Sequence, residues 1–193
     1  MPMQWSPALC RKEKCVKKPI SKFTIHGMWA SNKTDPQPMV CMKNVTKVRD
    51  LYMGMISKPT QTELHTSWPN FQGPDDFFFW QKQWYKHGTC SYSTFNQTQF
   101  FDVANDIWKG LQLFDILRAA SISPSISRYQ QRADFERAIR NHVGVPNLMI
   151  ELDCPSPSNE LLEIRMCRNH AGNAYIDCHH NGTCGLTSFK WKP

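Results

Sequence analysis

Two histidines far apart in the chain could share proton-transfer chemistry. His26 ends a short run of β-forming residues, and His87 directly follows Lys86. An imidazole changes charge near neutral pH, so one ring can accept a proton while another donates one. Lys86 disfavours the charged form of His87 and can offset negative charge on a reacting group. A single histidine of this kind is more often structural, so the prediction of a site depends on the pair.

One reaction uses a base, an acid and a cation and requires no metal. RNA can be cut by its own 2′-hydroxyl if a base takes that proton, an acid protonates the leaving 5′-oxygen and a cation offsets the charge on the phosphorane. Each such proton transfer contributes roughly 10²–10⁴ in rate. We therefore expect neither a metal nor a cofactor in a site that contains His26, Lys86 and His87.

Two elements must bring these residues together. Residues 23–26 are rich in β-formers, which predicts a strand that ends at His26 before the turn-prone Gly27. Residues 78–87 have acids before them, cations in the last turn and a glycine after them, which predicts a short helix. On such a helix Gln83, Lys86 and His87 share one face, while Trp80 and Trp84 fall on another.

The remaining pattern predicts one α+β domain over residues 1–193, an antiparallel sheet packed with helices. Apolar residues in 100–120 follow the helical period, so we expect a single core helix there. Residues 134–141 favour a further helix. Residues 148–154 and 161–167 alternate apolar and polar side chains like paired strands.

Composition indicates an oxidising compartment and a polyanionic partner. The eight cysteines are scattered over the chain, which favours disulfides over a zinc site. Four glycosylation sequons start at Asn32, Asn44, Asn96 and Asn181. We expect a secreted, soluble protein with no membrane partner. No signal peptide is visible, so the sequence is expected to be either the mature chain or one trimmed of its signal peptide and first residues. The formal net charge of +7 and the pI near 9.0 fit a nucleic acid, although many secreted proteins are basic for solubility.

Two segments resemble the signatures of the ribonuclease T2 family. Residues 23–32 read FTIHGMWASN and residues 79–90 read FWQKQWYKHGTC, against usual family forms FTIHGLWP and FW-x-x-EW-x-KHGTC. Gln4-Trp5-x-Pro-x-x-Cys10, Ser67–Asn70 and the cysteine spacing extend the resemblance over nearly the whole chain. It implies the disulfide-stabilised fold of that family and an endoribonuclease that acts on single-stranded RNA and leaves 2′,3′-cyclic phosphates.

The resemblance also implies a role for each matching residue. His87 is the expected general base, His26 the general acid, and Lys86 the cation at the phosphorane. Base and phosphate contacts are expected from Trp29, Lys82, Gln4 and Phe79. Ordinary packing is the alternative for Trp29, Gln4 and Phe79, and simple solvation for Lys82.

Sequence alone allows 105 pairings of eight cysteines, and the family resemblance selects Cys10–Cys15, Cys41–Cys90, Cys154–Cys184 and Cys167–Cys178. The high pI and Lys82 resemble plant self-incompatibility ribonucleases and their close relatives. That subgroup implies a monomer and, for a self-incompatibility ribonuclease, an F-box-type recognition partner.

Three positions depart from the family pattern. Gln83 stands where many members have Glu, Lys82 where many have a further His, and Ala30 where a proline closes the first segment. Gln83 can donate a hydrogen bond to phosphate, but it carries no charge and moves no proton. We therefore expect both histidines to titrate lower than in members with Glu, with activity reduced or shifted in pH.

Gln83 also supports an alternative from another class of function. A catalytically weak or inactive relative, serving in storage, defence or recognition, would keep the fold and lose turnover. Both histidines, Lys86 and the intact His-Gly-Thr-Cys segment favour an active enzyme. Digestion of total RNA with EDTA present separates the two.

Overall fold

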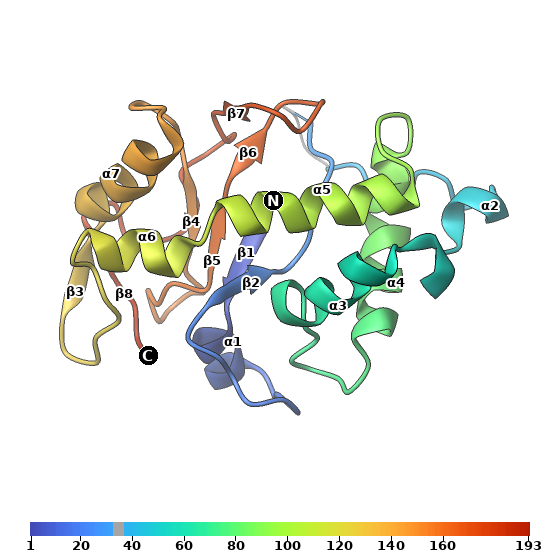
Figure 1. Cartoon of the computed structure of the whole chain (residues 1–193). Coiled ribbons are helices and arrows are strands. Elements are labelled where there is room, and N and C mark those ends of the chain that lie inside the picture. The colour runs from blue at the N-terminus through green and yellow to red at the C-terminus, as the bar shows by residue number, and fades with distance from the viewer. Residues whose placement is uncertain (33–36) are drawn as a thin grey trace.

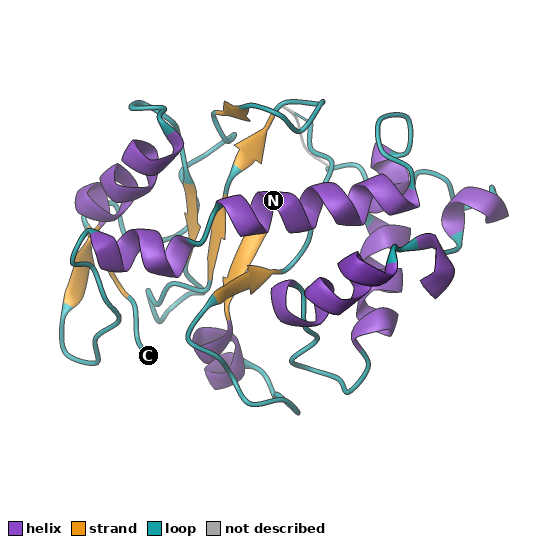
Figure 2. Ribbon diagram, viewed as in Figure 1, coloured by secondary structure: helices purple, strands orange, loops and turns teal. Residues whose placement is uncertain are grey.

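The computed structural model describes residues 1–32 and 37–193, and a four-stranded antiparallel sheet lies at its centre (Figures 1 and 2). Its order is β2-β1-β5-β4. The strands are β1 (Pro2–Trp5), β2 (Phe23–Ile25), β4 (Glu151–Asp153) and β5 (Glu163–Arg165). Leu152 pairs with Ile164, so the two strands predicted in the C-terminal half do pair. The α+β prediction is confirmed.

The two faces of this sheet have different chemistry. Met3 pairs with both Ile25 and Ile164, and all three side chains are fully buried in the core. Because successive side chains of a strand point to opposite faces, Glu163 and Arg165 share the other face with Gln4. His26, one residue beyond β2, continues that polar face.

Helix α5 (Gln97–Gly110) crosses the apolar face of the sheet (Figure 1). Asn96 and Gln99 form a reciprocal capping box at its start, which satisfies two free backbone N–H groups. Near its end the indole of Trp108 donates to the carbonyl of Phe23 at 2.8 Å. The helix is thereby joined to β2, the strand that leads to His26.

The prediction of one helix over 100–120 is wrong, because the chain forms α5 and then α6 (Leu113–Ala119). The apolar period continues through the break, which is why the pattern concealed it. Gly110 weakens the helix there, and Leu111 leaves helical geometry at φ −128°, ψ 65° while its side chain remains buried. The Trp108 carbonyl then accepts hydrogen bonds from the Leu111 N–H at 3.2 Å and from the Gln112 side chain at 2.6 Å.

The predicted helix at 134–141 is α7 (Arg132–Val143), which ends at Gly144 in left-handed geometry with φ 71°. Shorter elements complete the described chain. They are α1 (Ser6–Lys12), α2 (Thr46–Arg49), α3 (Lys58–Ser67), α4 (Asp76–Lys86), the 3₁₀ turns Met53–Met55 and Gly88–Ser91, and the strand pairs β3 (Tyr129–Gln131) with β8 (Ser188–Lys190) and β6 (Cys167–Arg168) with β7 (Tyr175–Ile176).

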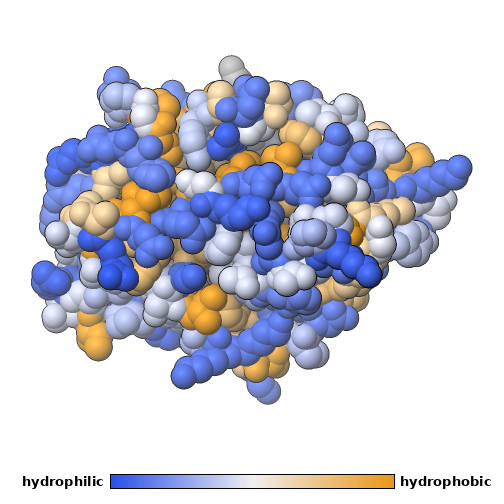
Figure 3. All heavy atoms as spheres, in the orientation of Figure 1, coloured by the Kyte–Doolittle hydropathy of each residue, from blue (hydrophilic) through white to orange (hydrophobic). Residues whose placement is uncertain are grey.

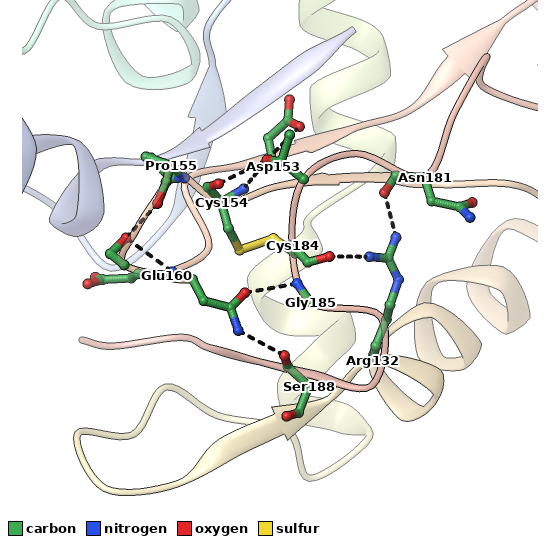
Figure 4. Close-up of a disulfide and its surroundings, with 12 residues drawn as sticks. Arg132, Asp153, Cys154, Pro155, Glu160, Asn181, Cys184, Gly185 and Ser188 are labelled. Atoms are coloured by element: carbon green, nitrogen blue, oxygen red, sulfur yellow. Dashed lines mark hydrogen bonds between the residues drawn. A yellow bond between two sulfur atoms is a disulfide. The ribbon is translucent and has the colours of Figure 1, made fainter.

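All eight cysteines are paired, in the four bridges that the family resemblance implies. Cys41–Cys90 joins the segment after β2 to the segment after α4, with a Cα–Cα distance of 4.9 Å. Cys154–Cys184 fixes the C-terminal loop beside β4, where Arg132 donates to the Cys184 carbonyl at 3.0 Å (Figure 4).

Hydrophilic residues cover most of the face drawn in Figure 3, and hydrophobic residues form small separate patches. In the described part of the chain, every helix is too short or too polar to cross a bilayer.

Candidate active site

The backbone of His26 is held on both sides. Its N–H donates to the Pro2 carbonyl at 3.0 Å, and its carbonyl accepts the indole N–H of Trp68 at 3.0 Å. The side chain stays about one-third exposed, at 32%. The strand prediction is therefore confirmed with a small shift: His26 lies just past β2, where its ring can still meet a substrate.

His87 lies at the C-terminal end of helix α4. The start of this helix is capped by Asp75, which accepts from the N–H of Phe78 at 3.1 Å. Two fully buried indoles anchor it, because Trp80 donates to Trp68 at 2.8 Å and Trp84 donates to Val48 at 2.7 Å. The helix begins two residues earlier than predicted, and His87 is its C-cap residue.

Gly88 does not end the helix in the way the sequence suggested. The chain continues into a 3₁₀ turn, and no left-handed conformation occurs at this glycine. A Cβ at position 88 would lie 2.2 Å from a ring carbon of Trp84. The glycine therefore lets the backbone after His87 pack directly on the indole that anchors α4.

Trp29 contacts both histidines. Its ring stacks on His87 at a centroid distance of 4.9 Å and 26°, and meets His26 edge-on at 5.1 Å and 74°. Its indole N–H donates to Oε1 of Gln83 at 3.1 Å. A Cβ on Gly27 would lie 2.1 Å from this indole nitrogen and 2.5 Å from Oε1 of Gln83. Only a glycine at position 27 leaves room for the pair.

His87 is held in its neutral form. The residue is 8% exposed, and burial, then Lys86 and His26, lower the pKa of His87 from 6.5 to about 4. Among the residues that the structure describes, no carboxylate pairs with this ring. A neutral imidazole at pH 7 has a free lone pair, so His87 can accept a proton. Burial is the largest cause of the lowered pKa, and Lys86, the cause expected from the sequence, comes second.

His26 has the opposite kind of neighbour, which sequence reasoning missed. Its Nδ1 forms a hydrogen bond with Oε1 of Glu163 on β5. Burial opposes ionisation of Glu163, but the bond from His26 and the charges of His26 and Arg165 hold the pKa of Glu163 below its usual value. The alternation of residues 161–167 predicted that Glu163 and Arg165 share a face. The sequence did not reveal that His26 lies across the sheet from them.

The other predicted site residues divide into two groups. Phe79 and Gln4 lie on the His26 side: the Phe79 ring centroid is 6.4 Å from the His26 ring centroid, and Gln4 pairs in the sheet with Glu163, the partner of His26. Lys82 and Lys86 are exposed on α4, and the ammonium of Lys82 lies 4.2 Å from the Phe78 ring centroid. In residues 1–32 and 37–193, no cluster of three or more metal-binding side chains occurs.

The four sequon asparagines, Asn32, Asn44, Asn96 and Asn181, are exposed. Positions 33 and 34 of the first sequon lie outside the described residues. The backbone carbonyl of Asn181 accepts a hydrogen bond from Arg132, while the Asn181 side chain points away from the neighbouring disulfide (Figure 4). Gly182, with φ 83°, follows at a point where a Cβ would lie 2.2 Å from the Leu152 carbonyl oxygen.

Comparison with known proteins identifies the family. The model of the Ribonuclease T2 family matches residues 1–178. Ribonuclease S-3 of Pyrus pyrifolia is 33% identical over 186 residues, which cover 92% of this chain and 79% of the relative. Ribonuclease MC1 from bitter gourd seeds superimposes with a TM-score of 0.84 at 28% identity, covering 98% of this chain and 96% of that one.

Japanese pear S3-RNase superimposes with a TM-score of 0.81 at 27% identity, covering 100% of this chain and 97% of that one. Solved relatives include an RNase MC1 mutant in complex with 5′-GMP and RNase NT in complex with 5′-AMP. The fold, the family match and these plant relatives agree with the two signature segments. The chain belongs to the ribonuclease T2 family and is an endoribonuclease of that type.

Proposed function

We propose that this endoribonuclease cuts single-stranded RNA through the 2′-hydroxyl of its substrate. His87 removes the 2′-proton, and the 2′-oxygen attacks phosphorus while the bond to the 5′-oxygen breaks. His26 gives a proton from Nε2 to the departing 5′-oxygen. The products are a 2′,3′-cyclic phosphate and a free 5′-hydroxyl, so no metal or cofactor is required.

One observation carries this assignment: two imidazoles with opposite surroundings contact the same indole. His87 is buried without an anion and is neutral at pH 7, as a general base must be. His26 is more exposed and bonds an ionised carboxylate, which suits a ring that must carry a proton. Groups whose surroundings favour different charge states divide naturally into base and acid.

Lys86 and Gln83 complete the helix side of the site. Lys86 is exposed at the last turn of α4, where a flexible ammonium can approach the phosphorane. Gln83 accepts the Trp29 N–H, so it sets the plane of the indole that stacks on His87. Trp29 in turn offers a surface for a base, a contact worth about 1–3 kcal/mol.

The distribution of positive charge supports RNA as the partner. Residues 11–22 hold six basic residues against one acid, so they carry five of the chain's net seven positive charges. Cys10–Cys15 closes a loop over the first residues of this basic segment, 11–14. The segment lies against α4 and the residues before it, because the N–H of Val16 donates to the Phe71 carbonyl at 2.8 Å and Lys17 pairs with Asp76. An RNA strand that leaves the site can continue over it. The nucleotide complexes of relatives are consistent with this partner.

Secretion and self-incompatibility belong to the same proposal. Four disulfides and exposed sequon asparagines support the secretory pathway and a monomeric glycoprotein. Similarity to pear S-RNases supports a pistil self-incompatibility role with an F-box-type partner, and a defence or phosphate-scavenging role is the alternative. Transcript confined to the pistil selects the first role, and expression in roots or seeds rejects it.

The test is digestion of RNA with EDTA present, followed by analysis of the new ends. We expect unchanged cleavage in EDTA, ends that are 2′,3′-cyclic phosphates, and no cleavage of DNA or of RNA methylated at the 2′-oxygen. Cleavage that requires a metal, or efficient cleavage of DNA, would overturn the mechanism. RNA binding without turnover would favour the alternative of an inactive recognition or storage protein.

A further inference from the structure

The two sides of this site differ in negative charge. On α4 the position where many family members have a glutamate is occupied by Gln83, which is uncharged. On the sheet side a carboxylate is present: Glu163 projects from the polar face of β5 and is only 7% exposed. The charged support missing from the helix is therefore available from a strand.

Glu163 reaches His26 across one intervening strand. It pairs with Gln4 of β1, and His26 lies on the far side of β1, bound through its N–H to Pro2. Oε1 of Glu163 meets Nδ1 of His26. An ionised carboxylate only accepts hydrogen bonds, so Nδ1 must carry the hydrogen and Nε2 is left for the substrate.

The second oxygen of Glu163 is held by Arg165, two residues along β5. The guanidinium donates to Oε2 at 3.3 Å and also pairs with Asp153 at 2.6 Å and with Glu151. It lies 5.5 Å from the Trp29 ring, and Trp29 stacks on His87. Strand β5 thus contacts the surroundings of both histidines, one directly and the other through Trp29.

We propose that Glu163 is the positioning residue of His26: it fixes the proton on Nδ1, directs Nε2 at the leaving oxygen and stabilises the protonated ring, while Arg165 holds Glu163 in place. This inference rests on the proposed role of His26 as general acid. It gives the site a carboxylate–histidine pair on the acid side that does not depend on position 83.

Two substrates with different leaving groups isolate this role. Uridylyl-(3′→5′)-uridine releases an alkoxide that needs a proton, whereas uridine 3′-(4-nitrophenyl phosphate) releases a nitrophenolate that leaves without one. The nucleoside that attacks is the same in both, so base preference cancels. Glu163→Gln preserves shape and removes charge. We expect kcat on the dinucleotide to fall about 10- to 100-fold, with KM nearly unchanged and with little loss on the nitrophenyl ester.

The pH profile on the dinucleotide gives a second readout. The titratable groups that face His26 in the described structure are Glu163 from β5 and His87 from α4. Without the anion the protonated ring loses its stabilising partner, so the alkaline limb of the Glu163→Gln profile should move to lower pH. Glu163→Asp keeps the charge and should recover part of both effects.

Glu160→Gln is the matched control. Glu160 is also buried, at 9% exposed, but it pairs with Arg11 and Lys192 and not with a histidine. This control should leave the ratio of the two substrates unchanged. Equal losses on both substrates in Glu163→Gln, or no loss on either, would overturn the proposal.

His26→Ala separates failure of this inference from failure of the mechanism. If His26→Ala lowers cleavage of the dinucleotide far more than of the nitrophenyl ester, His26 is the acid, and the Glu163 variants alone decide the inference. If His26→Ala lowers both substrates equally, the assignment of His26 as the acid is wrong.

Discussion

The sheet side and the helix side of the site hold the same side chain in contrasting surroundings. His26 follows a strand, remains one-third exposed and bonds the buried carboxylate of Glu163. His87 caps a helix, is nearly buried and has burial, Lys86 and His26 acting against its charge. The two motif histidines are therefore not interchangeable, because His26 has an anion beside it, whereas burial and positive neighbours lower the pKa of His87.

The largest expected effect is that of His87→Ala. We expect kcat to fall by about 10³–10⁴ on the dinucleotide and on the nitrophenyl ester alike, because both reactions need a base at the 2′-hydroxyl. A 2′-deoxy dinucleotide should bind with nearly unchanged affinity, since it has no proton to remove. If activity per folded molecule is near normal and the melting temperature falls, His87 is a packing residue and the contrast with His26 disappears.

The Gln83→Glu variant tests the contrast between the two histidines by placing an anion on α4, near His87. A carboxylate at position 83 would still accept the Trp29 N–H and would add an anion near His87, which favours the protonated ring. The pKa of His87 should rise from about 4, so the acidic limb of the pH–rate profile should move upward by about one pH unit.

The alkaline limb of the Gln83→Glu profile should move less, because His26 already has Glu163. This sharpens the expectation from sequence, which treated both histidines alike. An acidic limb that stays in place would show that position 83 does not couple to His87.

The free energy of unfolding should depend on pH through the titration of His87. Its pKa is lower in the folded protein than in the unfolded chain, so the unfolded state binds more protons between pH 6.5 and about 4. Stability is therefore full above pH 6.5 and is lost as pH falls toward 4. The loss should be about 2 kcal/mol after allowance for solvent screening.

Urea unfolding of the wild type and of His87→Asn, each at pH 7 and pH 4.5, measures this term. The variant should lose about 2 kcal/mol less between the two pH values. Equal pH dependence in both proteins would mean that His87 is not held neutral by folding.

The smallest expected effect lies outside both halves of the site. Lys12, Lys14, Lys18 and Lys22 are exposed in the basic segment, and each phosphate contact contributes to the salt dependence of binding. Changing all four to Gln should weaken binding of a 12-nucleotide RNA several-fold at low salt and reduce its salt slope, while cleavage of a dinucleotide stays normal. An unchanged slope would show that RNA does not follow this segment.

The local sequence pattern predicts much of the fold and the two elements that carry the histidines of the site. The strand before His26, the helix before His87, α7 and the pairing of β4 with β5 follow from periodicity and helix-end signals, which are properties of neighbouring residues. The break between α5 and α6 at Gly110–Gln112 could not be predicted in this way, because the apolar period continues through it. The turn depends instead on the packing of the buried Leu111.

Residue types and spacings are enough to identify the residues that could do the chemistry: two histidines, a lysine and the neutral Gln83. The same types and spacings do not reveal which histidine has an anion beside it, because that contact forms only in the folded chain. Glu163 lies 137 residues from His26 and meets it across β1, a contact that no local period encodes. The charge state of a side chain depends on burial and on through-space neighbours, so the division of roles that we propose for His26 and His87 depends on the assembled sheet and helix.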